Sequence, residues 1–326
     1  MRILFSLECF MTASDVSKEM SKAPYSEKFK MKNFWYQEFK KKLIVFINEQ
    51  DRNSGGCTAI NDTREWLIEA IVKENNECEN NLWKYLIMLE CTLFVPYFPL
   101  YEGENSADNK LFKGLKYSDK SREEALRTIS AWLGINYQFV IDCQKTYERA
   151  IKKMNGYWNK VLIGVGAGIV ASLLVVATMG GSIVAFFAAS GLYGAAAVSS
   201  GLAALGGGAI AAGGFGMAGG MAVLVGGGLL LGGGAGATLT MTLASTNPTG
   251  IMTETAKLYV VMKEIILALN HDTKRALEII SSVIDKISDL KKEITELKLK
   301  QKENAEKIKN LEKSISYLEE FLKMSK

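Results

Sequence analysis

The chain has 326 residues, a net charge of +4, 23% charged residues and 48% hydrophobic residues. This length accommodates two or three domains. A charge so close to balance argues against duplex DNA as a partner, because no part of the chain is strongly basic. The five cysteines are odd in number and show no CxxC spacing, which argues against a disulfide framework and against a zinc site.

Charged residues are missing from the middle of the chain. From Val161 to Thr253 there are 93 residues without Asp, Glu, Lys, Arg or His, and they include 24 of the 30 glycines. A soluble domain of that length would carry about twenty charges. We therefore divide the chain into a first part, residues 1–160, a glycine-rich central segment, residues 161–246, and a charged tail, residues 247–326.

The first part is predicted to be a soluble, mainly α-helical domain. Between residues 29 and 94, apolar side chains recur every three or four positions, as on helix faces that pack on a core. We expect a capped helix start at Asn61–Thr63 and a long helix from Ser121 to Lys153. The apolar run at residues 3–7 is too short for a signal peptide, so we expect a cytosolic protein with free thiols. One helix face would carry Phe34, Trp35, Phe39, Leu43, Phe46 and Ile47.

The sequence offers no motif for catalysis. The one histidine, His271, lies in the tail, so the first part lacks the imidazole that Ser/His/Asp and Cys/His sites need. Residues 214–219 fit GxGxxG, but no strand is predicted before them and no acidic residue follows within about 20 positions, as dinucleotide binding requires. We expect a protein that is not an enzyme and that uses no metal or cofactor.

A group of basic residues in the first part is a candidate ligand site. The group lies close in sequence to Phe112 and Tyr117, and cations beside aromatic rings suit a phosphorylated or nucleotide ligand. The alternative is an ordinary solvated face. The candidate residues are Lys110, Lys113, Lys116, Lys120 and Arg122.

The central segment is predicted to enter a bilayer as transmembrane helices. A crossing needs about 20 apolar residues, and Val161 to Met179 supplies nineteen. Residues 182–205 and 221–244 suit further crossings, and we expect two or four in all. Lys152 and Lys153 come shortly before the first crossing, and lysines at that place indicate that the chain enters the membrane from the cytosolic side. An even number of crossings would then leave both termini cytoplasmic, with the segment in the inner, or plasma, membrane.

The glycines of the central segment are arranged for helix packing. Small residues four positions apart allow two helices to approach closely in lipid. Such rows make the segment adhesive to itself and only weakly apolar, so that it can stay in a soluble assembly before it inserts. The residues of these rows are Gly164, Gly168, Ser172, Gly216, Gly220, Gly228, Gly232 and Gly236.

The tail carries a heptad pattern from Tyr259 to Leu322. Isoleucine dominates the a positions, which favours a parallel coiled coil and a homo-oligomer. A continuous helix over residues 248–324 would be about 115 Å long. Gln301 and Asn304 interrupt the pattern, and the alternative is a loop there that gives an antiparallel hairpin. The seam is formed by Ile280, Ile287, Leu290, Ile294, Leu297, Ile308, Leu311, Ile315 and Leu318.

The order of helical domain, glycine-rich hairpin and heptad tail resembles that of apolipoprotein L proteins and of Hailong-type anti-phage channels. The stretch ALGGGAIAAGGFGMAGGMAVLVGGG, residues 204–228, carries the likeness. The resemblance implies a homo-oligomer such as a tetramer, opened by a nucleotide oligomer that a partner enzyme makes. It also implies depolarisation of the host membrane in anti-phage defence. We therefore expect a triggered pore or ion channel, and the alternative is a passive membrane anchor that recruits a partner through the tail.

Overall fold

The computed structural model describes residues 2–50, 59–77, 81–97, 100, 107–112, 114–155 and 248–326. Every regular element within these ranges is a helix and none is a strand, as an all-α protein requires. The central segment lies outside the described residues. Among the helices that are described, none is both long and apolar enough to cross a membrane.

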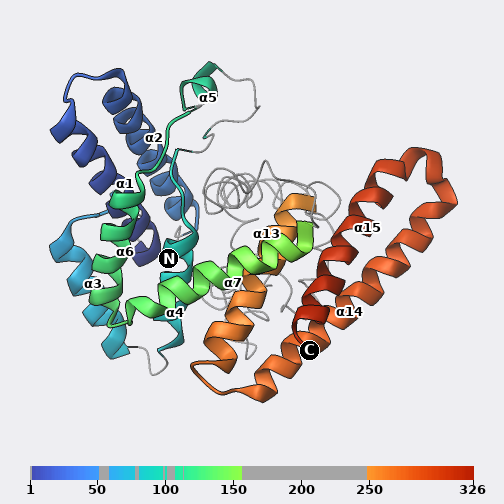
Figure 1. The fold of residues 1–326 in the computed structure, drawn as a ribbon. Coiled ribbons are helices and arrows are strands. Elements are labelled where there is room, and N and C mark those ends of the chain that lie inside the picture. Colours follow the sequence, from blue (N-terminus) through green and yellow to red (C-terminus); the bar gives the residue numbers. More distant parts are fainter. Residues whose placement is uncertain are drawn as a thin grey trace.

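The first part is built around its N-terminal helix, α1 (Arg2–Lys22). Leu4, Leu7 and Met11 of this helix are at most 1% exposed, and neighbouring helices cover it on several sides. The periodicity predictions did not include this helix, because buried residues on all its faces leave no amphipathic pattern. Around it pack α2 (Glu27–Gln50), α3 (Arg64–Glu77), α4 (Leu82–Leu93) and α6 (Asp119–Leu133), and the short α5 (Ala107–Phe112) packs on α2 (Figure 1).

Aromatic residues of α2 and of the segment that follows α4 pack together in this core. Trp35 is fully buried and stacks on Phe39 with 4.7 Å between ring centroids, and the edge-to-face contact of Trp35 with Tyr97 measures 5.4 Å. The predicted burial of Trp35 and Phe39 is confirmed. Phe34, predicted on the same face, is instead 41% exposed and contacts Phe112 of α5.

The single helix expected from Ser121 to Lys153 is wrong, since the structure has two helices there. The first, α6, ends at Gly134, whose φ of 68° is a left-handed conformation that closes the helix. Glycine adopts this conformation without the clash that a Cβ causes. The second helix, α7 (Tyr137–Asn155), then leads toward the central segment.

The tail is a helical unit with two breaks, not one continuous helix. It starts with α13 (Pro248–Val260), which continues as the π-helical turn η4 (Val261–Leu267). The chain then turns at His271, which has a φ of 52°. After this turn come α14 (Thr273–Leu297), the short 3-10 helix η5 (Lys298–Lys300) and α15 (Gln301–Met324).

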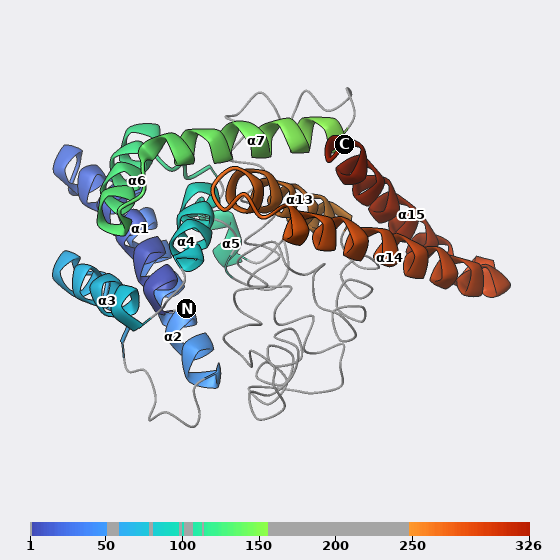
Figure 2. The ribbon, with the colours of Figure 1, turned by 90° about the horizontal axis from the view of Figure 1, so that it is seen from below.

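The helices α14 and α15 form an antiparallel hairpin within one chain, and the hairpin extends away from α1, α2 and α3 (Figures 1 and 2). Ion pairs join Lys291 to Glu319 at 3.0 Å and Glu293 to Lys307 at 2.8 Å. The described tail therefore forms the antiparallel hairpin that was the alternative prediction. The seam predicted for a parallel coiled coil lies instead between two helices of the same chain. The turn falls at the polar interruption, where the Asn304 side chain donates to the Leu297 carbonyl at 3.5 Å.

The predicted seam residues line the contact inside this hairpin. Leu290, Leu311 and Leu318 are at most 1% exposed. Heptad positions do not by themselves say whether the partner helix belongs to another chain or to the same one. Among the other seam residues, the buried ones are Ile287, Ile294, Ile308 and Ile315. The partly buried ones are Ile280 and Leu297.

Candidate functional site

The two helices that flank the central segment pack against each other. The helix α7 ends at Asn155 and α13 begins at Pro248, and the two are in extensive contact. Met154 and Met252, near these two ends, are 7% and 2% exposed and belong to the same hydrophobic core. Figures 1 and 2 show the end of α7 and the start of α13 on the same side of the helical body. The chain thus leaves and rejoins the body in one region, and we call the contact of α13 with the first part of the chain the junction.

Polar contacts tie the junction to the rest of the tail. The Thr146 hydroxyl of α7 donates a hydrogen bond to Oε1 of Glu264 in η4 at 2.5 Å. The Tyr259 hydroxyl of α13 donates to the carbonyl of Met324 at 3.1 Å, and its ring packs edge-on against Phe321 of α15. The helices α7, η4, α13 and α15 are therefore fastened together around the ends of the central segment.

Three titratable side chains of α1, α4 and α13 are buried in the interior, and those of α4 and α13 form an ion pair. Nζ of Lys257 lies 3.0 Å from Oε1 and 3.1 Å from Oε2 of Glu90. Lys257, Glu90 and Glu8 are only 1%, 3% and 5% exposed. We call these three residues the buried charge cluster; it connects the tail to the first part of the chain.

The surroundings of Glu8 favour its protonated form. Burial, reinforced by the negative charge of Glu90, raises the pKa of Glu8 to about 8, although the positive charge of Lys257 acts in the opposite direction. Burial also raises the pKa of the neighbouring thiols, Cys9 and Cys91. The Glu8 carboxyl is therefore protonated more readily than that of an exposed glutamate.

Sequence reasoning missed the buried charge cluster, although a signal was present. Glu8 lies in the run ILFSLECFM and Glu90 in the run LIMLECTLF, so each is a lone charge in an apolar helical stretch. Such a residue is buried when its helix is buried, and a buried charge needs a partner. The sequence does not indicate that the partner is Lys257, which lies 167 residues from Glu90.

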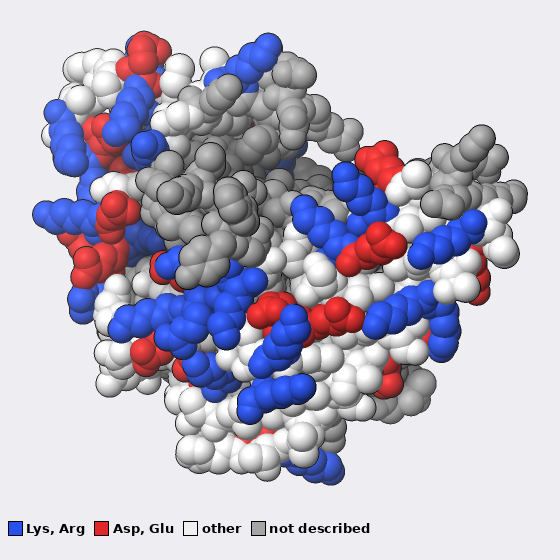
Figure 3. All heavy atoms as spheres, turned by 45° about the vertical axis from the view of Figure 1, so that its right-hand side comes forward, with Lys and Arg blue, Asp and Glu red and all other residues white. Residues whose placement is uncertain are grey.

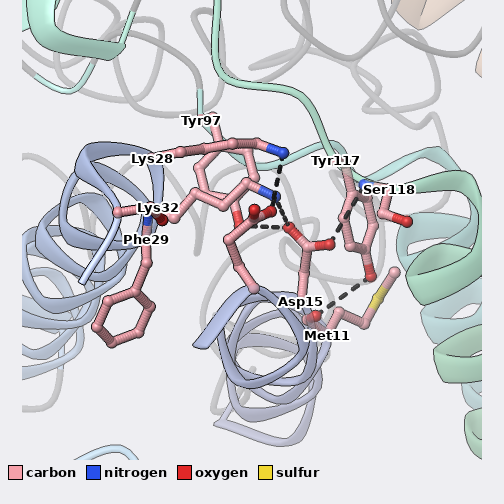
Figure 4. A network of polar contacts seen from close by, with 10 residues as sticks. Met11, Asp15, Lys28, Phe29, Lys32, Tyr97, Tyr117 and Ser118 are labelled. Atoms are coloured by element: carbon pink, nitrogen blue, oxygen red, sulfur yellow. Dashed lines mark hydrogen bonds and ion pairs between the residues drawn. The ribbon is translucent and has the colours of Figure 1, made fainter. Parts of the chain in front are cut away.

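A second polar network fixes the helices of the first part (Figure 4). Asp15 of α1 is 1% exposed and accepts from Nζ of Lys32 at 2.6 Å, from the Tyr97 hydroxyl at 2.7 Å and from the Ser118 amide at 3.3 Å. Glu19 pairs with Lys28 at 2.8 Å at the rim of this network. Its donors and acceptors are matched to one another, which gives it the properties of a structural support.

The predicted ligand-binding lysines that the structure describes are exposed, but the aromatic rings near them are not. Phe112 and Tyr117 are 2% and 6% exposed, so they offer no open face for stacking. Arg122 donates to the Thr92 carbonyl inside the fold, and burial lowers its pKa. On the face shown in Figure 3, basic side chains lie among acidic ones. The described lysines of the candidate site are Lys110, Lys116 and Lys120, and their binding of an anionic ligand stays a prediction.

Two further sets of predicted residues lie outside the described part of the chain. They are Lys113 of the basic group and the small-residue rows, Gly164, Gly168, Ser172, Gly216, Gly220, Gly228, Gly232 and Gly236. Among the residues that the structure does describe, no group of His, Cys, Asp or Glu side chains is arranged to hold a metal ion. Comparison of the chain with protein-family models, with curated proteins and with solved structures gave no match.

Proposed function

We propose that the chain is a membrane-inserting pore former, in which the central segment enters a bilayer while the helical body holds both of its ends. The observation that carries the proposal is the combination of the charge-free run with the junction. A run of 93 residues without charge is suited to lipid, and the helices on either side of it pack together.

The junction also supports the expected topology. Because α7 and α13 belong to one body, the chain must return to the side from which it entered, and this requires an even number of crossings. Lys152 and Lys153 are exposed near the end of α7. Lysines beside a span favour the cytoplasmic side of a membrane, so the body is expected to stay in the cytosol.

The composition of the segment favours a pore over a passive anchor. An anchor needs one span of about 20 residues, whereas the charge-free run has length for up to four. The rows of small residues favour contacts between spans, and such contacts within or between chains are what a multi-helix pore requires. As part of the same proposal, the pore is an oligomer of this chain, and an anionic ligand opens it.

Release of a trapped dye from liposomes tests the proposal. Val170→Arg puts a charge near the middle of the first span, at a cost of about 2.5–3.5 kcal/mol for insertion, and should reduce leakage strongly. A matched control is Leu277→Arg, the same kind of change at a side chain of α14 that is 65% exposed; it should leave leakage unchanged.

Two outcomes would contradict the proposal. Equal leakage by the Val170→Arg variant and the unmodified chain would exclude the first span from the pore. Tight binding of the unmodified chain to liposomes that stay sealed would favour the anchor instead.

A further inference from the structure

One edge of α14 exposes two apolar side chains to water. Leu277, Ile284 and Lys291 follow one another at seven-residue spacing, so they lie in one row along the helix. Lys291 pairs across the hairpin with Glu319 of α15, whereas Leu277 and Ile284 are 65% and 51% exposed. Single exposed apolar residues are ordinary, but two in one row form a stripe that a further helix would cover.

Two charges of opposite sign border this row. Lys274 lies three residues before Leu277, and Asp285 lies four residues after Ser281, so both are at the rim of the same helix face. Both charged side chains are exposed, and neither forms an ion pair with another side chain that the structure describes. Ser281, in the middle of the face, is small and exposed. We call Lys274, Leu277, Ser281, Ile284 and Asp285 the α14 stripe.

The order of these residues suits a second copy of the chain that runs in the opposite direction. Leu277 and Ile284 lie equally far from a point just before Ser281. An antiparallel copy centred at that point places Leu277 opposite Ile284 of the second copy. Lys274 then lies two residues, or about 3 Å along the axis, from the position opposite Asp285 of the second copy, and the long lysine side chain spans this offset. A parallel copy would bring like charges together, which is unfavourable.

We propose that α14 docks on α14 of a second copy of this chain through the α14 stripe, antiparallel, to give a symmetric dimer. The two-fold axis passes beside Ser281, so each contact occurs twice. The heptad seam does not compete for this partner, because it is buried between α14 and α15 of one chain. The dimer therefore uses the edge of the hairpin, and the hairpin projects from the helical body (Figures 1 and 2).

This dimer goes beyond the proposed function. It is formed by the helical body and needs no lipid, whereas the spans of the pore are expected to meet through the small-residue rows of the central segment. Leu277→Arg is therefore expected to leave leakage unchanged even though it disturbs the dimer. Failure of the dimer and failure of the pore proposal are thus distinguishable.

Disulfide cross-linking of the full chain in lipid-free solution tests the dimer. Cys57 and Cys78 are replaced by serine, so that new cysteines on α14 can be followed. The described native thiols are buried and are kept; they are Cys9, Cys91 and Cys143.

The positions of the new cysteines distinguish the two directions of pairing. The double variant Leu277→Cys with Ile284→Cys should give a covalent dimer on mild oxidation, because each new thiol faces the other new thiol of the second copy. Identical positions are seven residues, or about 10 Å, apart along the axis, which is too far for a disulfide. Either single variant should therefore cross-link at least about tenfold more slowly. The same separation prevents a disulfide within one chain.

Val72→Cys provides the matched control. Val72 of α3 is 52% exposed, close to the 51% of Ile284, and its cross-linking rate measures chance collisions. Cross-linking of the double variant at this collision rate would overturn the dimer, and the stripe would then be bare or covered by a different partner. Cross-linking of the single variants as fast as that of the double variant would overturn the antiparallel order, because only parallel copies bring identical positions together.

Reversal of the bordering charges gives a second readout in the double-cysteine chain. Lys274→Glu turns two attractive contacts into repulsive ones and should slow cross-linking by about two- to tenfold, as exposed charges allow. Addition of Asp285→Lys restores opposite signs and should return the rate to its original value. A rate that stays equally slow after this addition would overturn the proposed register, because the two charges would not face each other.

Discussion

The junction and the tail hairpin are both helix contacts, but they use charge in opposite ways. At the junction, Lys257 and Glu90 pair in the interior, with side chains 1% and 3% exposed. In the hairpin, Lys291 and Glu319 pair at the same 3.0 Å distance, with side chains 59% and 46% exposed. The hairpin buries an apolar seam and leaves its ions in water, whereas the junction buries its ions as well.

This difference indicates which contact is suited to change. Apolar seams depend little on pH, and exposed ion pairs contribute about 0–1 kcal/mol. A buried pair is stable only as long as both partners are present and correctly charged, because a lone buried charge is strongly unfavourable. We therefore interpret the hairpin as a permanent part of the fold and the junction as the conditional one.

The largest effect is expected from removal of the ammonium group of the junction. Lys257→Met keeps most of the side-chain volume but removes the buried ion pair with Glu90, and the expected destabilisation is about 3–5 kcal/mol. Urea unfolding of the full chain measures it. The double variant Lys257→Met with Glu90→Gln removes both charges and should recover much of the loss. Equal losses in the single and double variants would mean that packing, not charge, holds the junction.

A smaller or similar loss of stability against unfolding is expected from a cavity in the hairpin. Leu311 is fully buried in the seam, and Leu311→Ala should cost about 2–5 kcal/mol. Since no charge is involved, the loss should be the same at pH 6 as at pH 9, and thermal unfolding at the two pH values measures it. A loss that varies with pH would contradict the distinction between the two contacts.

The smallest effect is expected from the exposed pair of the hairpin. Lys291→Met removes the pair with Glu319, and the expected change is about 0.2–1 kcal/mol. The comparison with Lys257→Met is direct, because the substitution and the shortest distance in the pair are the same, whereas the burial of the two pairs differs strongly. Losses of equal size in the two variants would remove burial as the explanation.

The sequence predicts the helices better than their partners. Spacing alone identifies the packing of Trp35 and Phe39, and the heptads identify seam residues such as Leu311. The same heptads fit an internal hairpin and an intermolecular coiled coil equally well, so the topology of the tail stayed open. The helix α1 was missed because its first half is buried on all sides and therefore lacks an amphipathic pattern.

The buried charge cluster shows where sequence reasoning ends. Glu8 and Glu90 stand out as single charges in apolar runs, but only the tertiary fold brings them to Lys257. The burial of the rings beside the basic group is likewise a property of the fold. Phe112 and Tyr117 are turned into the core, and their proximity to lysines in sequence gave no sign of it.

The central claim, that the central segment enters a bilayer, is tested most directly by the depth of a label within it. All five cysteines lie before residue 144, so Leu174→Cys, with the native cysteines replaced by serine or alanine, gives one site for an environment-sensitive fluorophore near the middle of the first span. In liposomes that the chain permeabilises, lipids with a quencher near the ends of their acyl chains should quench the label, and aqueous iodide should not. Quenching by iodide alone would contradict the account.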